Sequence, residues 1–372
     1  KPRIICRANG PFFYFLNYRL KAVKKAFIPN VLCLKPFQQT FLAPFIRCKN
    51  ANAISYERET FMLSDGQQLA LDWYHGERLK YFEEDEMIKP IALFILDLSE
   101  DSQSQDLRFL IPMAFEIGYR CVVLHYRGCG NITLTKPRLT SLCDVDDTEE
   151  VVSHLKQTKI QNSIIAIAFG LGGTQVVNYL ISSGEKSKID AAVCISFIFD
   201  HIAMYENLNK TYLGNTVSTQ ILNYFKHIIN KNEDLLRQVS NIDFDEIIEC
   251  ENIFEFNSKY MIKVNNYADV ETYYKRISCI GFLNKIKVPV LCINSIDDPF
   301  SPVIPFDEIK NTNGFAMILT SRGGHRAFID SFTPPYFIEK ILDEFLLNLF
   351  HVSIDSHNYR NHLRAGESYW YV

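Results

Sequence analysis

Short, almost continuous apolar segments recur along the chain and alternate with longer segments in which apolar residues return every three or four positions. The former are of strand length and comprise residues 91–96, 121–126, 164–169, 191–197, 288–295 and 315–319. Such segments are typical of parallel strands buried on both faces. Helical periodicity marks the segments that begin at Leu107, Asp144, Leu171 and Tyr336. This alternation predicts an α/β protein with an open, mostly parallel, doubly wound sheet.

Two parts of the chain depart from this alternation. Residues 56–74 alternate between apolar and polar positions around the turn Ser64-Asp65-Gly66, which predicts a β-hairpin at the start of the sheet. The long interval 198–286 separates two predicted strands and is mainly helical and rich in aromatic residues. We expect it to form an inserted cap over the carboxyl ends of the strands, where open α/β sheets bind their ligands.

The length of 372 residues exceeds the size to which one core usually grows. We expect an α/β domain at residues 51–350, an N-terminal extension at residues 1–50 and a C-terminal tail at residues 351–372. In the extension, PFFYFLNYRLKAVKK (residues 11–25) places basic residues after an aromatic cluster. This segment fits a membrane-surface anchor and equally a packed extension with a solvated basic face.

Composition narrows the classes of partner and compartment. The formal net charge of −4 gives no electrostatic footprint for nucleic acid. The ten cysteines form no CxxC pair and no Cys/His spacing of a zinc site, and Cys121, Cys194 and Cys292 lie inside apolar segments. We therefore expect reduced core cysteines and an intracellular protein with no metal or cofactor. The sequence begins with Lys1 rather than Met, and we expect a further N-terminal segment, which could anchor the protein to a membrane.

The stretch AIAFGLGGTQ, residues 166–175, links a predicted strand to a predicted helix. Many hydrolases carry the pattern G-x-S-x-G at such a turn, where small neighbours let the backbone push a serine hydroxyl outward. Ala168 and Gly172 keep both flanking positions small here. Gly170 stands in place of the serine, so the attacking hydroxyl is missing.

Two downstream loops carry an acid and a base in the order that follows such a serine. The segment IDDPFSP, after the strand at 288–295, contains Asp297 and Asp298. The segment SRGGHRAF, after the strand at 315–319, places His325 in a glycine-containing loop before the last helix. Each loop alone is weak evidence, but their order and spacing together with the Gly170 turn make chance agreement improbable.

A series of motifs in this order resembles the α/β-hydrolase domain-containing proteins, in the branch of acylglycerol lipases, esterases and medium-chain phospholipases that includes the bacterial YheT-like proteins. The motifs are LKPFQQTFLAPFIR, DGQQLALDWY, GYRCVVLHYRGCG, FGLGGTQVVNYL, VETYYKRIS, IKVPVLCINSIDDPFSP and GGHRAF. The resemblance covers about residues 34–346 and implies an α/β-hydrolase fold. It places the family's acid on Asp298, which Pro302 follows four positions later, its base on His325 and its nucleophile on Gly170. Many members of the family carry an N-terminal membrane anchor.

A second departure from the family follows the strand at 91–96. The family has a glycine-containing loop there that supplies one amide to an oxyanion, and Leu171 would supply the other. This chain reads LDLSE, with Asp97 and Glu100 in place of the glycines. Carboxylates would oppose the negative charge that develops on an oxyanion.

These departures support two hypotheses. The first is a catalytically silent hydrolase fold that binds a lipid, an acyl ester or a protein partner. The second is a working ester, acylglycerol or phospholipid hydrolase that uses an unrecognised nucleophile, for which Thr174, Ser163 and Cys129 are candidates, or a water activated by His325.

The arrangement of the retained acid and base gives a geometric expectation. We expect His325 to be hydrogen bonded to Asp298 through one ring nitrogen and to face Gly170 with the other. Without a serine, this pair would serve mainly as a structural hydrogen bond.

Overall fold

A computed structural model of the chain describes residues 1–48, 52–76, 89–98, 100–143, 145–157 and 163–355. Its centre is a nine-stranded sheet of order β1-β9-β8-β7-β6-β4-β5-β3-β2. All pairings from β5 through to β9 are parallel, whereas β2, β3 and β1 are added antiparallel at the two edges. This confirms the prediction of a mostly parallel sheet with a hairpin at its start. The strands are β1 (Arg3–Cys6), β2 (Glu57–Met62), β3 (Gln68–Tyr74), β4 (Ile91–Ile95), β5 (Arg120–Leu124), β6 (Ile164–Phe169), β7 (Ala191–Ile195), β8 (Val290–Ser295) and β9 (Phe315–Thr320).

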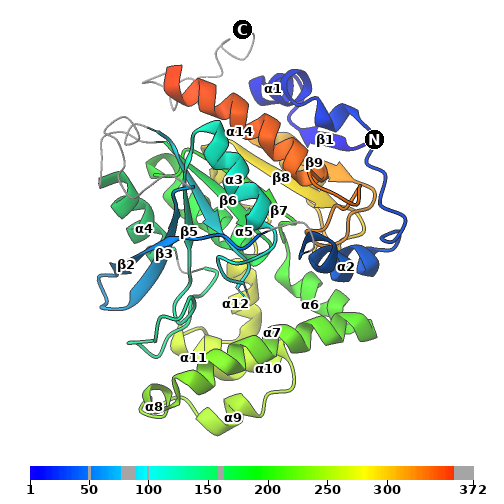
Figure 1. Cartoon of the computed structure of the whole chain (residues 1–372). Helices are drawn as coiled ribbons and strands as arrows, with labels where there is room; N and C mark the ends of the chain where they lie inside the picture. The colour runs from blue at the N-terminus through cyan, green and yellow to red at the C-terminus, as the bar shows by residue number, and fades with distance from the viewer. Residues whose placement is uncertain (49–51, 77–88, 99, 144, 158–162, 356–372) are drawn as a thin grey trace.

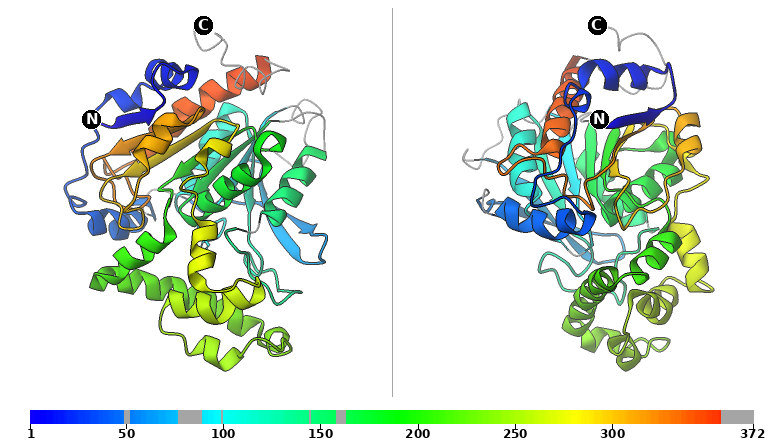
Figure 2. Two further views of the ribbon diagram at one scale, coloured as in Figure 1. Left: turned by 180° about the vertical axis from the view of Figure 1, so that it is seen from behind. Right: turned by 90° about the vertical axis from the view of Figure 1, so that its right-hand side faces the viewer.

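Helices cover both faces of the sheet (Figure 1 and Figure 2). One face packs against α3 (Leu107–Ile117) and α14 (Phe337–Asp355), the other against α4 (Asp146–Gln157) and α5 (Leu171–Ser183). Side chains of a strand point alternately to the two faces, so each buried strand must be apolar at every position. The shorter segments of this layer are η3 (Gly184–Lys186), η5 (Leu283–Lys285) and α13 (Phe306–Asn311). The predicted helix start at Asp144 lies outside the described residues.

The segment between β7 and β8, predicted as a cap, is helical and gathers at one end of the sheet (Figure 1). Polar side chains begin several of its helices: Asp200 accepts hydrogen bonds from the amides of Ile202 and Ala203, and Thr211 accepts one from Gly214. Such caps satisfy amides that a helix leaves unpaired. Its elements are α6 (His201–Asn209), α7 (Tyr212–Lys231), α8 (Glu233–Leu236), α9 (Phe244–Ile248), α10 (Ile253–Phe256), the π-helical η4 (Asn257–Met261), α11 (Ile262–Val264) and α12 (Val270–Ile277).

The N-terminal segment contributes to the core instead of lying apart from it. Strand β1 pairs with β9 and extends the sheet by one edge strand. Helix α1 (Pro11–Arg19) buries Phe12, Phe15 and Leu16, and the rings of Phe15 and Phe345 of α14 lie 5.8 Å apart. Two further elements follow, η1 (Ala22–Lys24) and α2 (Pro36–Cys48). Of the two interpretations of residues 11–25, these buried rings favour the packed extension.

Helix α14 runs into the predicted C-terminal tail as far as Asp355, and residues 356–372 lie outside the described part. Among the helices that are described, none combines the length and the hydrophobicity needed to cross a lipid bilayer.

Candidate functional site

The turn at Gly170 connects β6 to α5 and has a backbone conformation that favours glycine. Its φ is +50° and its ψ −118°, and its amide donates a 2.9 Å hydrogen bond to the carbonyl of Ile195. A residue with a side chain is strained in this region by about 1–3 kcal/mol. Two positions on, a Cβ on Gly172 would lie 2.3 Å from the carbonyl oxygen of Leu96. The small residues thus let α5 approach the end of β4 closely.

The topology brings the loops after β4 and β6 together. Strand β4 has β5 on one side and β6 on the other, so the chain reverses its direction of winding at β4. Loops diverge at such a switch point and leave a crevice at the carboxyl ends of the strands. The loop that contains Asp97 and the turn at Gly170 both lie at this crevice.

Asp298 and His325 are paired, as the sequence analysis expects. The Nδ1 atom of His325 lies 3.0 and 3.1 Å from the two carboxylate oxygens of Asp298, which is fully buried. The neighbouring Asp297 instead accepts a hydrogen bond from the amide of Gly324 and holds the histidine loop. The ring of Phe300 stacks on the imidazole at 4.1 Å. The ring is therefore fixed on one face and at one nitrogen.

The other ring nitrogen of His325 faces Gly170. Its Nε2 atom lies 3.3 Å from the point where a Cβ on Gly170 would be. A carboxylate oxygen of Asp97, Oδ2, lies 2.2 Å from the same point and 4.0 Å from Nε2. The Asp97 carboxylate therefore occupies the space into which a side chain at position 170 would extend.

Asp97 also engages a backbone amide of its own loop, the loop in which the family resemblance places one donor to the oxyanion. The other carboxylate oxygen of Asp97, Oδ1, accepts a 2.8 Å hydrogen bond from the amide of Leu98. Leu171, whose amide would be the second donor, is buried and begins α5 directly after Gly170. A backbone amide of the loop that would supply one donor is thus already bonded to the carboxylate of Asp97.

The charges around His325 favour its protonated form. Burial by itself lowers the pKa of His325, but the carboxylates of Asp298 and Asp97 outweigh this effect and raise the pKa to about 9. Burial would raise the pKa of Asp97, but the positive charges of His325 and Arg326 hold it below its ordinary value. At neutral pH an imidazolium thus lies between two carboxylates, and an imidazolium cannot accept a proton from a nucleophile.

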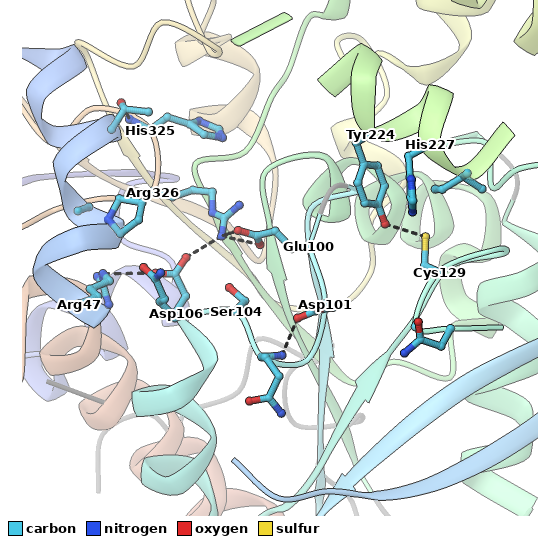
Figure 3. A pocket seen from close by; sticks show the side chains of 18 of the residues that line it. Arg47, Glu100, Asp101, Ser104, Asp106, Cys129, Tyr224, His227, His325 and Arg326 are labelled. Atoms are coloured by element: carbon cyan, nitrogen blue, oxygen red, sulfur yellow. Dashed lines mark hydrogen bonds and ion pairs between the residues drawn. The ribbon is translucent and has the colours of Figure 1, made fainter. Parts of the chain in front are cut away.

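Two arginines that sequence reasoning missed, Arg47 (buried) and Arg326 (partly buried), complete the charge network (Figure 3). Arg326 lies 2.6 to 2.7 Å from carboxylate oxygens of Glu100 and Asp106. Arg47 of α2 pairs with Glu339 and lies 3.3 Å from Asp106. Glu100, like Asp97, therefore has a cation beside it. The signals in the sequence were an arginine directly after His325 and an arginine within a helix that has no other charged residue.

A cavity of about 610 Å³ opens beside His325 and is bounded by α2 on one side and α7 on the other (Figure 3). This volume is within the range of sites for small ligands. Its wall combines the charged network with backbone and aromatic groups. Its lining includes Thr40, Arg47, Glu100, Tyr224, Lys231 and His325.

The three candidate nucleophiles lie in different surroundings. Thr174 is buried, with its hydroxyl 3.1 Å from Nε2 of His201, and Ser163 precedes β6, at the opposite end of that strand from Gly170. Cys129 does line the cavity, but burial raises the pKa of its thiol to about 11, and Tyr224 donates a hydrogen bond to its sulfur. A thiol attacks as the thiolate, so a raised pKa makes Cys129 unreactive.

No group of three or more metal-ligating side chains is placed to hold an ion within the described ranges. The site combines carboxylates with the guanidinium groups of Arg47 and Arg326 and the imidazole of His325. What such a site can do is hold a polar ligand through charge and hydrogen bonds.

Comparison with known proteins agrees with the motifs and the fold. No protein-family model matches the chain. Human phospholipase ABHD3 is 28% identical over 350 residues, which cover 93% of this chain and 84% of that protein. Mouse monoacylglycerol lipase ABHD2 is 23% identical over 249 residues, 63% of this chain and 58% of that protein.

A solved structure gives the same fold at low identity. The crystal structure of a membrane phospholipase A, described as a bacterial virulence factor, matches with a TM-score of 0.50 and 14% identity, over 85% of this chain and 93% of the other. The chain thus has an α/β-hydrolase fold, and its sequence is similar to α/β-hydrolase domain-containing proteins, among them one named as a phospholipase and one named as a monoacylglycerol lipase.

Proposed function

We propose that this chain is a catalytically silent member of its family that binds an ester lipid or a related acyl compound without hydrolysing it. One observation carries the proposal: the Asp97 carboxylate fills the space beside Gly170 that a nucleophilic side chain would need. A missing hydroxyl alone could be a single substitution. A missing hydroxyl together with an acidic side chain in its place removes both the nucleophile and the room for it.

The electrostatics support the same conclusion. Acyl transfer requires a neutral base and free amides that stabilise a developing negative charge. Here His325 is protonated at neutral pH, and the amide of Leu98 is bonded to Asp97. Each feature opposes a different step, so restoring only one would leave the reaction blocked.

The ligand class follows from the cavity and from the family. Human phospholipase ABHD3 and mouse monoacylglycerol lipase ABHD2 carry names of lipid-acting enzymes. The cavity offers cations at Arg326 and Lys231 and aromatic surface at Tyr224. Such a wall suits the polar end of an ester lipid, and we assign the acyl part to the space beneath α7.

The alternative function is hydrolysis through another nucleophile, as the retained Asp298–His325 pair and the helical insertion suggest. Asp97 lies near Gly170, and its carboxylate would be one candidate for such a nucleophile. The hydrogen bond from the Leu98 amide and the charge of Arg326 lower the basicity of this carboxylate and hence its reactivity. Cys129 is held as a thiol. We therefore place this alternative second.

Labelling with a fluorophosphonate and turnover of medium-chain phospholipids and monoacylglycerols test the proposal directly. We expect no covalent adduct and no turnover above that of the His325→Ala variant. Mass spectrometry of lipids extracted from the purified protein should reveal a bound acyl compound, which the cavity variant Tyr224→Ala loses. An adduct or a turnover that His325→Ala abolishes would overturn the proposal.

A further inference from the structure

Helix α2 turns two polar side chains toward the protein interior and two large apolar ones toward solvent. Gln39 and Arg47 are 1% and 2% exposed, whereas Phe45 is 69% exposed and Leu42 is also exposed. Surface helices normally turn an apolar stripe toward the core and polar residues toward water. The outward apolar side of α2 therefore has no partner in the described chain.

The segment before α2 continues this apolar surface. Ile28 and Val31 are 70% and 71% exposed, and Leu32 and Leu34 are about half exposed. The segment is fixed in place, because the Asn30 amide donates to the carbonyl of Ile329 and a guanidinium nitrogen of Arg322 donates to the carbonyl of Leu34. We call these outward residues the α2 face: Ile28, Val31, Leu32, Leu34, Leu42 and Phe45. Contiguous exposed apolar side chains of this kind mark sites that bind a protein or a membrane.

Charge decides between these partners. The first 56 residues contain ten lysines and arginines and not one aspartate or glutamate, although the whole chain has a formal net charge of −4. Four lysines in or just before this segment of the sequence are exposed: Lys21, Lys24, Lys25 and Lys35. A second copy of the chain would bring the same positive charge to the interface and repel it. An anionic lipid surface offers both acyl chains for the apolar residues and negative charge for the lysines.

The opposite side of α2 belongs to the site. Thr40, Ala43, Pro44 and Arg47 line the cavity, and the Thr40 hydroxyl accepts a hydrogen bond from the backbone amide of His325. Helix α2 thus has the α2 face on one side and the cavity on the other. We propose that residues 21–47 dock on an anionic phospholipid bilayer and place the cavity mouth at the lipid surface. This docking proposal rests on the proposed function only in assuming that the cavity binds a lipid.

Vesicle binding tests the surface independently of any ligand in the cavity. The chain should co-sediment with vesicles of phosphatidylcholine and phosphatidylserine in a 7:3 ratio, and binding should weaken with salt and on pure phosphatidylcholine. The variant Leu42→Ser/Phe45→Ser should bind at least roughly tenfold more weakly. The matched control is Met62→Ser, an exposed apolar residue on edge strand β2, which should bind as the unchanged chain does.

A second pair of variants tests the charge. Lys24→Glu/Lys25→Glu should lose binding to the anionic vesicles, whereas Lys275→Glu/Lys287→Glu, which reverses the same number of charges elsewhere, should keep it. All four substituted positions are exposed, so thermal unfolding should be nearly unchanged.

Three outcomes would overturn the membrane proposal. They are no binding to anionic vesicles, equal loss in the matched controls, and a dimer in light scattering that Phe45→Ser dissociates. Failure of the proposed function would look different, because a catalytically active chain could still bind vesicles through the α2 face. Conversely, a silent chain that fails to bind vesicles would leave the site proposal intact.

Discussion

A carboxylate oxygen of Asp97 lies 2.2 Å from the point at which a side chain on Gly170 would begin. Carbon and oxygen atoms that are not bonded to each other do not approach so closely, so the two positions exclude one another. The Asp97 carboxylate can lie where it does only because Gly170 has no side chain. This relationship makes the consequences of substitution specific.

Substitution of Gly170 by serine should destabilise the fold. The positive φ costs about 1–3 kcal/mol for a residue with a side chain, and displacement of Asp97 adds to it, so we expect a loss of about 2–4 kcal/mol. Urea unfolding of the single variants and of Asp97→Gly/Gly170→Ser gives the coupling between the two positions. We expect Asp97→Gly to offset part of the loss, by at least about 1 kcal/mol. Strictly additive effects would contradict the close approach.

Recovery of hydrolysis should require both changes. Gly170→Ser alone must push the Asp97 carboxylate aside but leaves its negative charge in the site together with a protonated His325, and should remain inactive. Asp97→Gly/Gly170→Ser frees the Leu98 amide and lowers the pKa of His325, and should turn over a short-chain ester measurably. The triple variant with His325→Ala is the control and should lose this activity. Equal activity of the single and double variants would mean that Asp97 does not block the site.

The imidazole of His325 should titrate far above the ordinary value of 6.5, at a pKa of about 9. Because the folded-state pKa is the higher one, the imidazolium stabilises the fold fully below about pH 6.5, and this contribution is lost as the pH rises through about 9. The difference corresponds to about 3 kcal/mol. NMR titration of the imidazole protons measures the pKa, and unfolding at pH 6 and pH 9.5 measures the stability.

Two variants sharpen this measurement. Asp97→Asn removes one of the two carboxylates that raise the pKa of His325 and should lower that pKa. His201 is the internal reference, because burial lowers its pKa to about 3 and it should stay neutral throughout. A His325 titration at or below pH 6.5 would show that the two carboxylates do not act on it as the geometry indicates.

Loss of the buried Arg47 guanidinium should lower the free energy of unfolding strongly. Arg47→Met leaves the buried carboxylate of Glu339 and the partly buried carboxylate of Asp106 without this cation, and we expect a loss of about 3–5 kcal/mol. Arg237→Met is the matched control, because the ion pairs of Arg237 with Glu233 and Asp245 are exposed and its loss should barely change the melting temperature. Similar melting temperatures for the two variants would contradict the buried network.

Much of the fold was predictable because its signals are local. The strands are continuous apolar segments, since a parallel strand between two helical layers must be apolar on both faces. The turn at Gly170 and the loops with Asp298 and His325 each follow such a strand, and the structure brings these three residues together. Their roles in binding or catalysis remain predictions.

Other features depend on which segments meet in space. Residues 3–6 form an edge strand only because β9 offers an open edge, and the sequence analysis had placed them in an extension. Arg47 and Arg326 come from opposite ends of the chain and meet at Asp106, and neither hydrophobic periodicity nor a motif carries that information. The exposure of the apolar side of α2 likewise depends on which side of this helix packs against the rest of the protein.

By itself, the sequence determined the family, the order of the strands along the chain and the loss of the hydroxyl at Gly170, because these depend on neighbouring residues. It also placed a carboxylate in the loop after β4. Only the tertiary structure decided that the carboxylate of Asp97 points into the space beside Gly170 and His325. The physical reason is that the switch in winding at β4 brings two separate loops to one crevice, where an atom can occupy a given volume only once.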